Sequence, residues 1–358
     1  MSGGLLPEHP ALQHERASER APRPLPLFLE LVREVSVHDP KLAADALTGL
    51  RAYEQAPRRT RPLPRPETAR VRGAALRDHG GEGPPTILVP SLINPPRILD
   101  LDDQVSLTAA IARMGRHALL LDWGNADERS KLSVTGHIEE LLLPLLRSIG
   151  KPAALVGYCL GGTMAIAAAN LVPVDRVVTL AAPWNFARYP QASHAALQGM
   201  WRHSQTAAKS LGALPMEVLQ AAFWSLDPER TVRKFAEFGR LDPASAEARR
   251  FVELEEWANE GEPLPYPAAK EMIEELFGED LSGSGGWNIG GRSVSDDLPV
   301  PSLHLTAERD LIAPPQSAAS GEVVAIPSGH VGMIVGSART RLYDALGAFL
   351  ERPTASST

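Results

Sequence analysis

Short apolar runs alternate with longer stretches of helical periodicity through most of this 358-residue chain. The apolar runs predict buried strands, at residues 86–89, 117–121, 153–156, 176–180, 301–306 and 322–326. A less apolar run at residues 70–76 predicts an edge strand. Apolar positions at helical spacing predict helices, at residues 25–37, 41–53, 98–115, 133–149, 164–171 and 337–350. Strands that alternate with helices favour an α/β fold with a mostly parallel sheet.

The alternation stops in the segment 184–297, which is helical, irregular and rich in aromatic residues. Its apolar side chains fit either a substrate access path or an ordinary core, because periodicity does not separate the two. The side chains concerned are Phe223, Trp224, Phe235 and Phe238. We therefore expect an N-terminal helical and proline-rich segment at 1–66, an α/β core at 67–183 and 298–352, and a cap at 184–297. Residues 1–23 are rich in Pro, Glu, Arg and Ser and predict a loosely attached segment.

Composition narrows the class of protein. The chain has 44% hydrophobic and 22% charged residues, as globular proteins do, and its formal net charge of −7 predicts no nucleic-acid partner. No apolar run approaches the roughly 20 residues that span a bilayer, and the polar N-terminus lacks the apolar stretch of a signal peptide. The single cysteine excludes an internal disulfide, so the cytoplasm is the expected compartment. Cysteine and histidine do not cluster at zinc spacing, and no metal site is expected.

That single cysteine, Cys159, lies in a Gly-x-Cys-x-Gly motif between a predicted strand and a predicted helix. In this context the motif is typical of a nucleophile elbow, with cysteine in place of serine. Glycines suit such a strained turn because they let the neighbouring backbone pass close to it. The start of the helix points N–H groups at Cys159 and favours a thiolate there. The alternative is a buried structural cysteine behind a glycine-rich turn.

A cysteine nucleophile needs a base and a third group that orients the base. The α/β-hydrolase fold places them in the chain order nucleophile, acid, histidine. Asp310 and His330 satisfy this order after Cys159, and both follow predicted strands at the sheet edge where such folds carry their sites. Glu308 is the main alternative as the acid. His304 lies inside a predicted strand and is interpreted as a core residue.

The oxyanion hole of this fold takes backbone N–H groups from the residue after the nucleophile and from the loop after the first central strand. We therefore expect Leu160 and either Leu92 or Ile93 to supply them. The alternative for the second loop is an ordinary proline-capped turn. Four further residues are candidate substrate contacts: Tyr158, Asp122, Trp184 and Asn185. For Asp122 a structural role is an equally open interpretation.

Several motifs occur in one order along residues 70–350. They read PSLINPPRILDL, LLDWG, GYCLGG, FVELEEW, AERDLIAPP and PSGHVGMIVG. In these motifs the chain resembles polyhydroxyalkanoate synthases, most closely the short type that pairs with a second subunit. The resemblance implies an α/β-hydrolase fold with a helical cap. It also places the family's catalytic cysteine, aspartate and histidine at Cys159, Asp310 and His330.

The resemblance implies an acyltransferase that moves 3-hydroxyacyl groups from CoA thioesters to a polyester through an acyl-cysteine. Acyl-CoA is then a substrate, and no cofactor is expected. The implied partners are the growing polyester and either a second synthase subunit or a second copy of the chain, at a polymer granule in the cytoplasm. Two positions depart from the family: Leu311 stands where a histidine is common, and Asn185 where an aspartate is. They keep open a cysteine-dependent hydrolase of thioesters, esters or polymer. A third alternative is a non-catalytic protein that binds acyl chains or granules, and the complete set of Cys159, Asp310 and His330 argues against it.

Overall fold

The computed structural model describes residues 20–353. Residues 354–358 lie outside the described part, and so do residues 1–19, most of the segment predicted to be loosely attached. The chain forms two compact units. The larger unit contains Pro62–Val218 and Glu260–Thr358, and the smaller one contains Met1–Arg61 and Leu219–Asn259.

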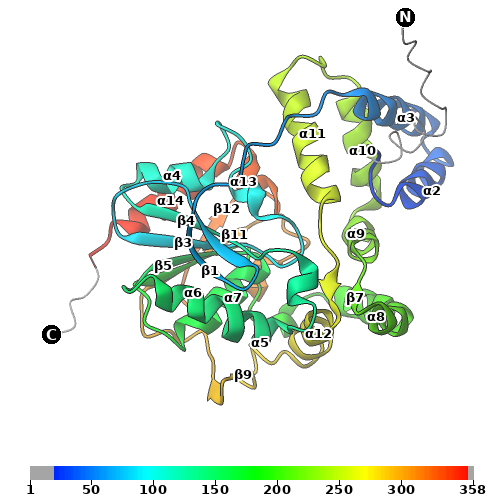
Figure 1. Ribbon diagram of the computed structural model, residues 1–358. Helices are drawn as coiled ribbons and strands as arrows, with labels where there is room; N and C mark the ends of the chain where they lie inside the picture. Colours follow the sequence, from blue (N-terminus) through cyan, green and yellow to red (C-terminus); the bar gives the residue numbers. More distant parts are fainter. Residues whose placement is uncertain (1–19, 354–358) are drawn as a thin grey trace, which may run out of the picture. The chain divides into compact units, whose positions relative to one another are not determined.

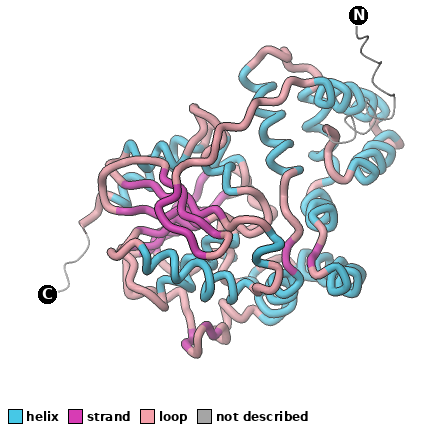
Figure 2. Tube along the Cα trace, in the orientation of Figure 1, coloured by secondary structure: helices cyan, strands magenta, loops and turns pink. Residues whose placement is uncertain are grey.

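An eight-stranded sheet forms the centre of the larger unit (Figure 2). The strands lie in the order β1-β2-β4-β3-β5-β6-β11-β12 and are parallel from β4 to β12. Their bounds are β1 Glu67–Val71, β2 Ala74–Asp78, β3 Pro85–Val89, β4 His117–Asp122, β5 Ala154–Tyr158, β6 Arg176–Leu180, β11 Ser302–Ala307 and β12 Glu322–Ile326. β3, β5 and β6 are buried at every position, as strands covered on both faces are. The predicted α/β class with a mostly parallel sheet is confirmed.

The start of the sheet differs from the prediction of one edge strand at residues 70–76. β1 and β2 form an antiparallel hairpin, and β2 also pairs antiparallel with β4. The prediction was wrong because Arg72 and Gly73 form a two-residue turn, in which Arg72 has a φ of 51°. Such a turn reverses the chain through left-handed backbone, and an arginine there carries no turn signal in the sequence.

Helices cover both faces of this sheet. In Figure 1, α4 (Leu107–Arg113) and α14 (Arg339–Leu350) lie on one face, whereas α6 (Leu143–Ser148) and α7 (Leu160–Ala169) lie on the other. Each helix turns its apolar residues toward the strands, so the core of the larger unit has one layer on each side of the sheet.

The helix predicted at residues 98–115 is shorter in the structure. Its first part is the 3₁₀ helix η1 (Pro96–Leu99), and the α-helix begins only at Leu107. Between them, the Asp102 carboxylate accepts hydrogen bonds from the N–H groups of Gln104 (2.7 Å) and Val105 (2.8 Å). An aspartate that caps its own following backbone forms a turn in place of a helix.

The remaining elements of the larger unit are short, apart from α8 (Gln191–Leu211). They are η2 Ala126–Arg129, α5 Val134–His137, η3 Ile138–Leu142, η4 Phe186–Arg188, β7 Ala213–Leu214, β8 Leu264–Pro265, α12 Tyr266–Lys270, η5 Glu271–Gly278, β9 Asn288–Ile289, β10 Arg292–Ser293, η6 Pro315–Ser317 and α13 Gly332–Val335. The elements α5, η3 and α6 together make up the helix predicted at residues 133–149. Among residues 20–353, no helix is both long and apolar enough to cross a membrane.

The smaller unit is built of helices around an apolar core. Its helices are α2 Leu25–Ser36, α3 Pro40–Gln55, α10 Pro228–Phe238, α11 Ala246–Asn259 and the part of α9 (Met216–Ser225) from Leu219 onward. The rings of Phe28 and Phe235 lie 4.6 Å apart at the centre. α3 and α10 approach closely at Gly49, where a Cβ would lie 1.8 Å from the Phe235 carbonyl oxygen. The two N-terminal helices predicted from periodicity are confirmed.

The structure answers the question that periodicity left open for three of the four aromatic residues. Trp224, Phe235 and Phe238 belong to the core of the smaller unit and are at most 6% exposed. They are therefore core residues. Phe223 is partly exposed and is not among the residues of this core, so the interpretation of Phe223 stays open. The predicted cap, 184–297, divides between the units, because Leu219–Asn259 groups with the N-terminal helices. Its function as a cap stays a prediction.

Candidate active site

The candidate nucleophile occupies the turn between β5 and α7. Cys159 has a φ of 54° and a ψ of −132°, which residues other than glycine rarely adopt. Its N–H donates to the carbonyl of Leu180 in β6 (2.9 Å), and its carbonyl accepts from the N–H of Gly162 (2.8 Å). These bonds hold a partly exposed thiol on a strained strand-to-helix turn. The geometry is that of a nucleophile elbow.

Three glycines make this turn sterically possible. A Cβ on Gly157 would lie 2.4 Å from the Gly162 Cα, and one on Gly162 would lie 2.3 Å from the Ala182 side chain. A Cβ on Gly161 would lie 2.1 Å from the carbonyl oxygen of Val89, at the end of β3. The glycines therefore let β3, β5 and α7 meet at the nucleophile, as the motif predicts.

Asp310 and His330 lie together in the loops after β11 and β12. Nδ1 of His330 donates to Oδ2 of Asp310 at 2.7 Å, and the side chains are 8% and 0% exposed. The other carboxylate oxygen accepts from the N–H groups of Ile312 (2.8 Å) and Ala313 (2.9 Å), which orients it. Glu308, the alternative acid, is exposed. The structure therefore selects Asp310 as the carboxylate that orients His330.

Opposing effects act on the imidazole of His330. Burial lowers its pKa, whereas the charges of Cys159 and Asp310 and the hydrogen bonds to both side chains raise it. The net result is a pKa above the usual value of histidine. A protonated imidazole beside a cysteine stabilises the thiolate, which is the nucleophilic form. The structure thus brings the three predicted residues together, while their catalytic role stays a prediction.

The first predicted oxyanion donor lies at the start of α7. Leu160 is the first residue of this helix, and N–H groups in a first turn have no acceptor within the helix. The loop after β3 passes beside this turn, since a Cβ on Gly161 would also lie 2.5 Å from the Pro90 carbonyl oxygen. The indole N–H of Trp123 donates to the same carbonyl at 3.1 Å and holds the loop.

The second predicted donor belongs to that loop. Leu92 and Ile93 are 2% and 8% exposed. The Ile93 N–H lies 3.4 Å from the hydroxyl oxygen of Ser91, and the Leu92 carbonyl accepts from the buried Arg129 at 3.5 Å. Because the Ile93 N–H has an acceptor, these contacts favour Leu92 as the second donor. The oxyanion hole itself stays a prediction.

Three of the four candidate substrate contacts have structural partners near the triad. Tyr158 packs against the His330 ring, with the centroids 5.1 Å apart, and its hydroxyl lies 3.5 Å from the His330 carbonyl. The N–H groups of Trp184 and Asn185 both donate to the Ser317 carbonyl, at 2.7 and 2.9 Å. All three therefore support loops that carry the triad, and their contact with substrate stays a prediction.

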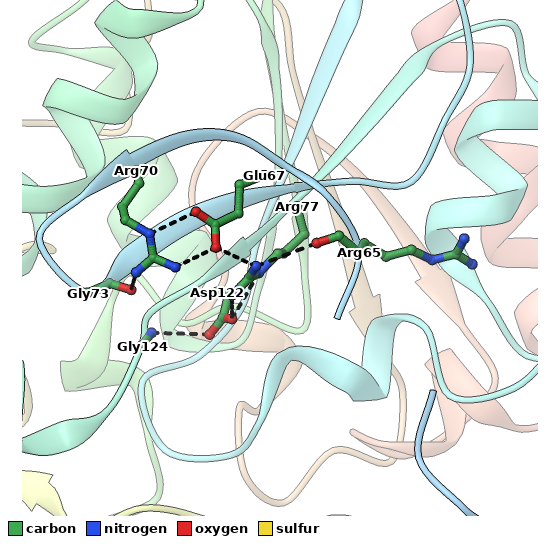
Figure 3. Close-up of polar contacts among 7 residues, drawn as sticks. All are labelled: Arg65, Glu67, Arg70, Gly73, Arg77, Asp122 and Gly124. Atoms are coloured by element: carbon green, nitrogen blue, oxygen red, sulfur yellow. Dashed lines mark hydrogen bonds and ion pairs between the residues drawn. The ribbon is translucent and has the colours of Figure 1, made fainter. Parts of the chain in front are cut away.

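Asp122, the fourth candidate, lies in an ion-pair network of β1, β2 and β4 (Figure 3). Its carboxylate pairs with Arg77 at 3.1 Å and accepts from the N–H of Gly124, also at 3.1 Å. Arg77 pairs in turn with Glu67 at 2.7 Å, and Glu67 also contacts Arg70. These contacts favour the structural interpretation of Asp122.

Two further histidines are structural. The ring nitrogens of His304 lie 2.9 Å from the Thr179 hydroxyl and 3.0 Å from the Ser320 carbonyl oxygen, which confirms its interpretation as a core residue. His137 is fully buried, and its Nδ1 lies 2.7 Å from the Ser133 carbonyl oxygen. Burial lowers the pKa of His137 to about 4.

Sequence reasoning missed Tyr189. Its hydroxyl donates to the carbonyl of Ile312, two residues after Asp310, at 3.0 Å. Burial raises its pKa well above the usual value, and the charge of Cys159 adds to this effect. No motif marks this tyrosine, and only the fold brings it to the site.

Comparisons with known proteins extend these observations. No protein-family model matches the chain. The chain is 25% identical over 286 residues to the poly(3-hydroxyalkanoate) polymerase subunit PhaC of Allochromatium vinosum, covering 74% of this chain and 80% of the relative. It is 26% identical over 276 residues to the subunit of the same name from Synechocystis sp., covering 70% of this chain and 73% of that relative. A solved hydrolase from Pseudomonas aeruginosa PA01 aligns with a TM-score of 0.51 and 16% identity, over 78% of this chain and 94% of that chain, and this likeness shows the fold.

These comparisons agree with the structure of the larger unit. The larger unit, with its mostly parallel sheet and with Cys159 on the turn after β5, has the same fold as the solved hydrolase. The polymerase subunits confirm the resemblance that the sequence motifs predict. The chain is an α/β-hydrolase-fold protein similar in sequence, over most of its length, to poly(3-hydroxyalkanoate) polymerase subunits.

Proposed function

We propose that this protein is an acyltransferase that transfers 3-hydroxyacyl groups from CoA thioesters to a growing polyester. The observation that carries the proposal is the arrangement of Cys159, His330 and Asp310 in a chain similar to polymerase subunits. Because the acyl group arrives activated as a thioester, acyl-CoA is the substrate and the proposed reaction uses no cofactor or metal. A second subunit or a second copy of the chain, and a place at a polymer granule, belong to the same proposal.

In the first half-reaction, Sγ of Cys159 attacks the thioester carbonyl carbon while His330 holds the thiol proton. The N–H groups of Leu160 and of Leu92 or Ile93 stabilise the oxyanion, an interaction worth about 3 kcal/mol per donor in other enzymes. When the tetrahedral intermediate collapses, the bond from carbon to the CoA sulfur breaks, and His330 returns the proton to CoA. The acyl group remains on Cys159.

In the second half-reaction, the 3-hydroxyl of another unit attacks the acyl group. His330 accepts the hydroxyl proton, and Asp310 holds its other ring nitrogen in the correct orientation. An ester bond forms, the bond to the sulfur of Cys159 breaks, and the proton returns to the thiol. Attack by water on the same intermediate would give a free 3-hydroxy acid, so exclusion of water separates acyl transfer from hydrolysis.

The test is an assay of purified protein with 3-hydroxybutyryl-CoA, in which CoA release and products are followed together. We expect CoA release with oligomer or polymer, reduced roughly 1000-fold or more in Cys159→Ala. CoA release with free 3-hydroxybutyrate would identify a hydrolase instead. If the wild type releases CoA no faster than Cys159→Ala, both alone and with a candidate second subunit, the result would contradict both functions and favour a binding protein.

A further inference from the structure

A chain of hydrogen bonds connects Tyr189 to the triad. The hydroxyl of Tyr189 donates to the carbonyl of Ile312 (3.0 Å), and the N–H of Ala313 donates to Oδ1 of Asp310 (2.9 Å). The Ile312 carbonyl and the Ala313 N–H belong to one peptide group. A donor on the oxygen of a peptide polarises the group and strengthens donation by its N–H. Oδ2 of the same carboxylate accepts from His330 at 2.7 Å.

The position of Tyr189 is fixed by its surroundings. The residue is 7% exposed, and its ring stacks on Phe186 with the centroids 5.9 Å apart. The ring of Phe277 packs against it at 4.6 Å. Burial, together with the charge of Cys159, raises the pKa of the phenol well above its usual value, so the hydroxyl keeps its proton. The side chain is therefore a permanent donor held in one place.

A second set of contacts joins the same two segments. The N–H groups of Trp184 and Asn185 donate to the Ser317 carbonyl, and the Asn185 amide donates to the Ala318 carbonyl at 2.8 Å. The segment from Trp184 to Tyr189 thus holds the turn after Asp310 at both of its ends. Small displacements of this segment are transmitted to the carboxylate.

We propose that Tyr189 is a positioning residue for Asp310, acting through the Ile312–Ala313 peptide group. Its hydroxyl fixes and polarises this peptide, which keeps the carboxylate oriented toward His330. The proposal deepens the proposed acyl transfer and rests on it for the effect on turnover. Its effect on the pairing of Cys159 with His330 is independent of the substrate.

The test uses Tyr189→Phe, which removes only the hydroxyl, and reads the reaction of iodoacetamide with the thiol by mass. Cys159 is the only cysteine of the chain, so alkylation reports on this residue alone. The matched control is Tyr343→Phe, because the buried Tyr343 hydroxyl has no hydrogen-bond partner in the described part of the chain. The rate of alkylation is measured from pH 5 to 11 for the wild type and both variants, and turnover of 3-hydroxybutyryl-CoA is measured alongside.

We expect Tyr189→Phe to move the upper inflection of the alkylation profile, at which His330 loses its proton, to lower pH. The direction follows from the contribution of Asp310 to raising the pKa of His330. Turnover should fall by roughly fivefold with little change in KM, the size expected when one neutral hydrogen bond is lost. In an Asp310→Asn background, Tyr189→Phe should have no further effect on the profile, since both changes act through one carboxylate.

A Tyr189→Phe profile that matches those of the wild type and of Tyr343→Phe would overturn the proposal. An additive effect in the Asp310→Asn background would overturn it as well, because the hydroxyl would then act by another route. Absence of turnover in every variant, including the wild type, would refute the proposed acyl transfer alone. The alkylation profiles would still decide the role of Tyr189.

Discussion

Replacing Gly161 by alanine perturbs the contact that brings β3 beside the nucleophile. The added Cβ would lie 2.1 Å from the Val89 carbonyl oxygen and 2.5 Å from that of Pro90. Both atoms belong to the backbone and cannot turn aside as a flexible side chain can. Because a close carbon-to-oxygen contact is about 3.3 Å, the start of α7 and the loop after β3 must separate by roughly 1 Å.

Two terms set the change in the free energy of unfolding. Overpacking of a well-packed interior costs about 1–3 kcal/mol, and rigid backbone on the opposite side places Gly161→Ala near the upper limit. The higher helix propensity of alanine offsets about 0.5–1 kcal/mol of this cost. We expect a net loss of roughly 2 kcal/mol. Displacement of reacting groups by this distance also lowers turnover, by about 100-fold.

Urea unfolding and the rate of Cys159 alkylation measure the two effects. The matched control is Gly199→Ala in α8, the same change at a helical position where, apart from the adjacent residues and the backbone of the helix itself, no atom of the described residues lies within 4 Å of the added Cβ. This control should gain up to about 1 kcal/mol of stability and retain the wild-type alkylation rate. Equal stability of the two variants would show that the backbone yields at no cost and would refute the steric argument. If Gly161→Ala is destabilised but its Cys159 is alkylated at the wild-type rate, the contact between α7 and the loop after β3 does not hold the nucleophile in place.

Three further predictions concern stability. Burial lowers the pKa of His137 to about 4, so the unfolded chain binds a proton between pH 6.5 and 4 that the folded protein does not bind. The free energy of unfolding therefore falls as the pH falls through this range, and His137→Gln should reduce that fall by roughly 3 kcal/mol. An unchanged pH dependence in urea unfolding would contradict this. Arg77→Ala breaks the network with Asp122 and should cost about 1 kcal/mol or less; a cost that does not shrink in 1 M salt would argue against an electrostatic cause. Glu271→Ala removes the carboxylate that accepts from the N–H and the hydroxyl of Thr135 and should cost about 2–3 kcal/mol; thermal unfolding like that of the wild type would show that water replaces the carboxylate.

Much of the larger unit follows from local patterns in the sequence. β6 and β12 have the predicted limits, because a short apolar run between turn residues is decided by its own residues. The elbow at Cys159 could be predicted for a similar reason, since glycines on both sides of a nucleophile have a steric meaning that does not depend on distant residues. The chain order of Asp310 and His330 follows from the topology of a parallel sheet.

Only the tertiary structure decided which groups meet. Asp310 and Glu308 are two residues apart and chemically alike, and the choice between them depends on the direction in which a loop turns its side chains toward His330. Periodicity places Phe235 on the apolar face of a helix but does not show what covers this face, and the structure places the residue in the core of the smaller unit. Tyr189 reaches the Ile312 peptide across 123 positions of the chain. Contacts of this kind arise when separate segments pack, so the residues on either side of Tyr189 carry no sign of them.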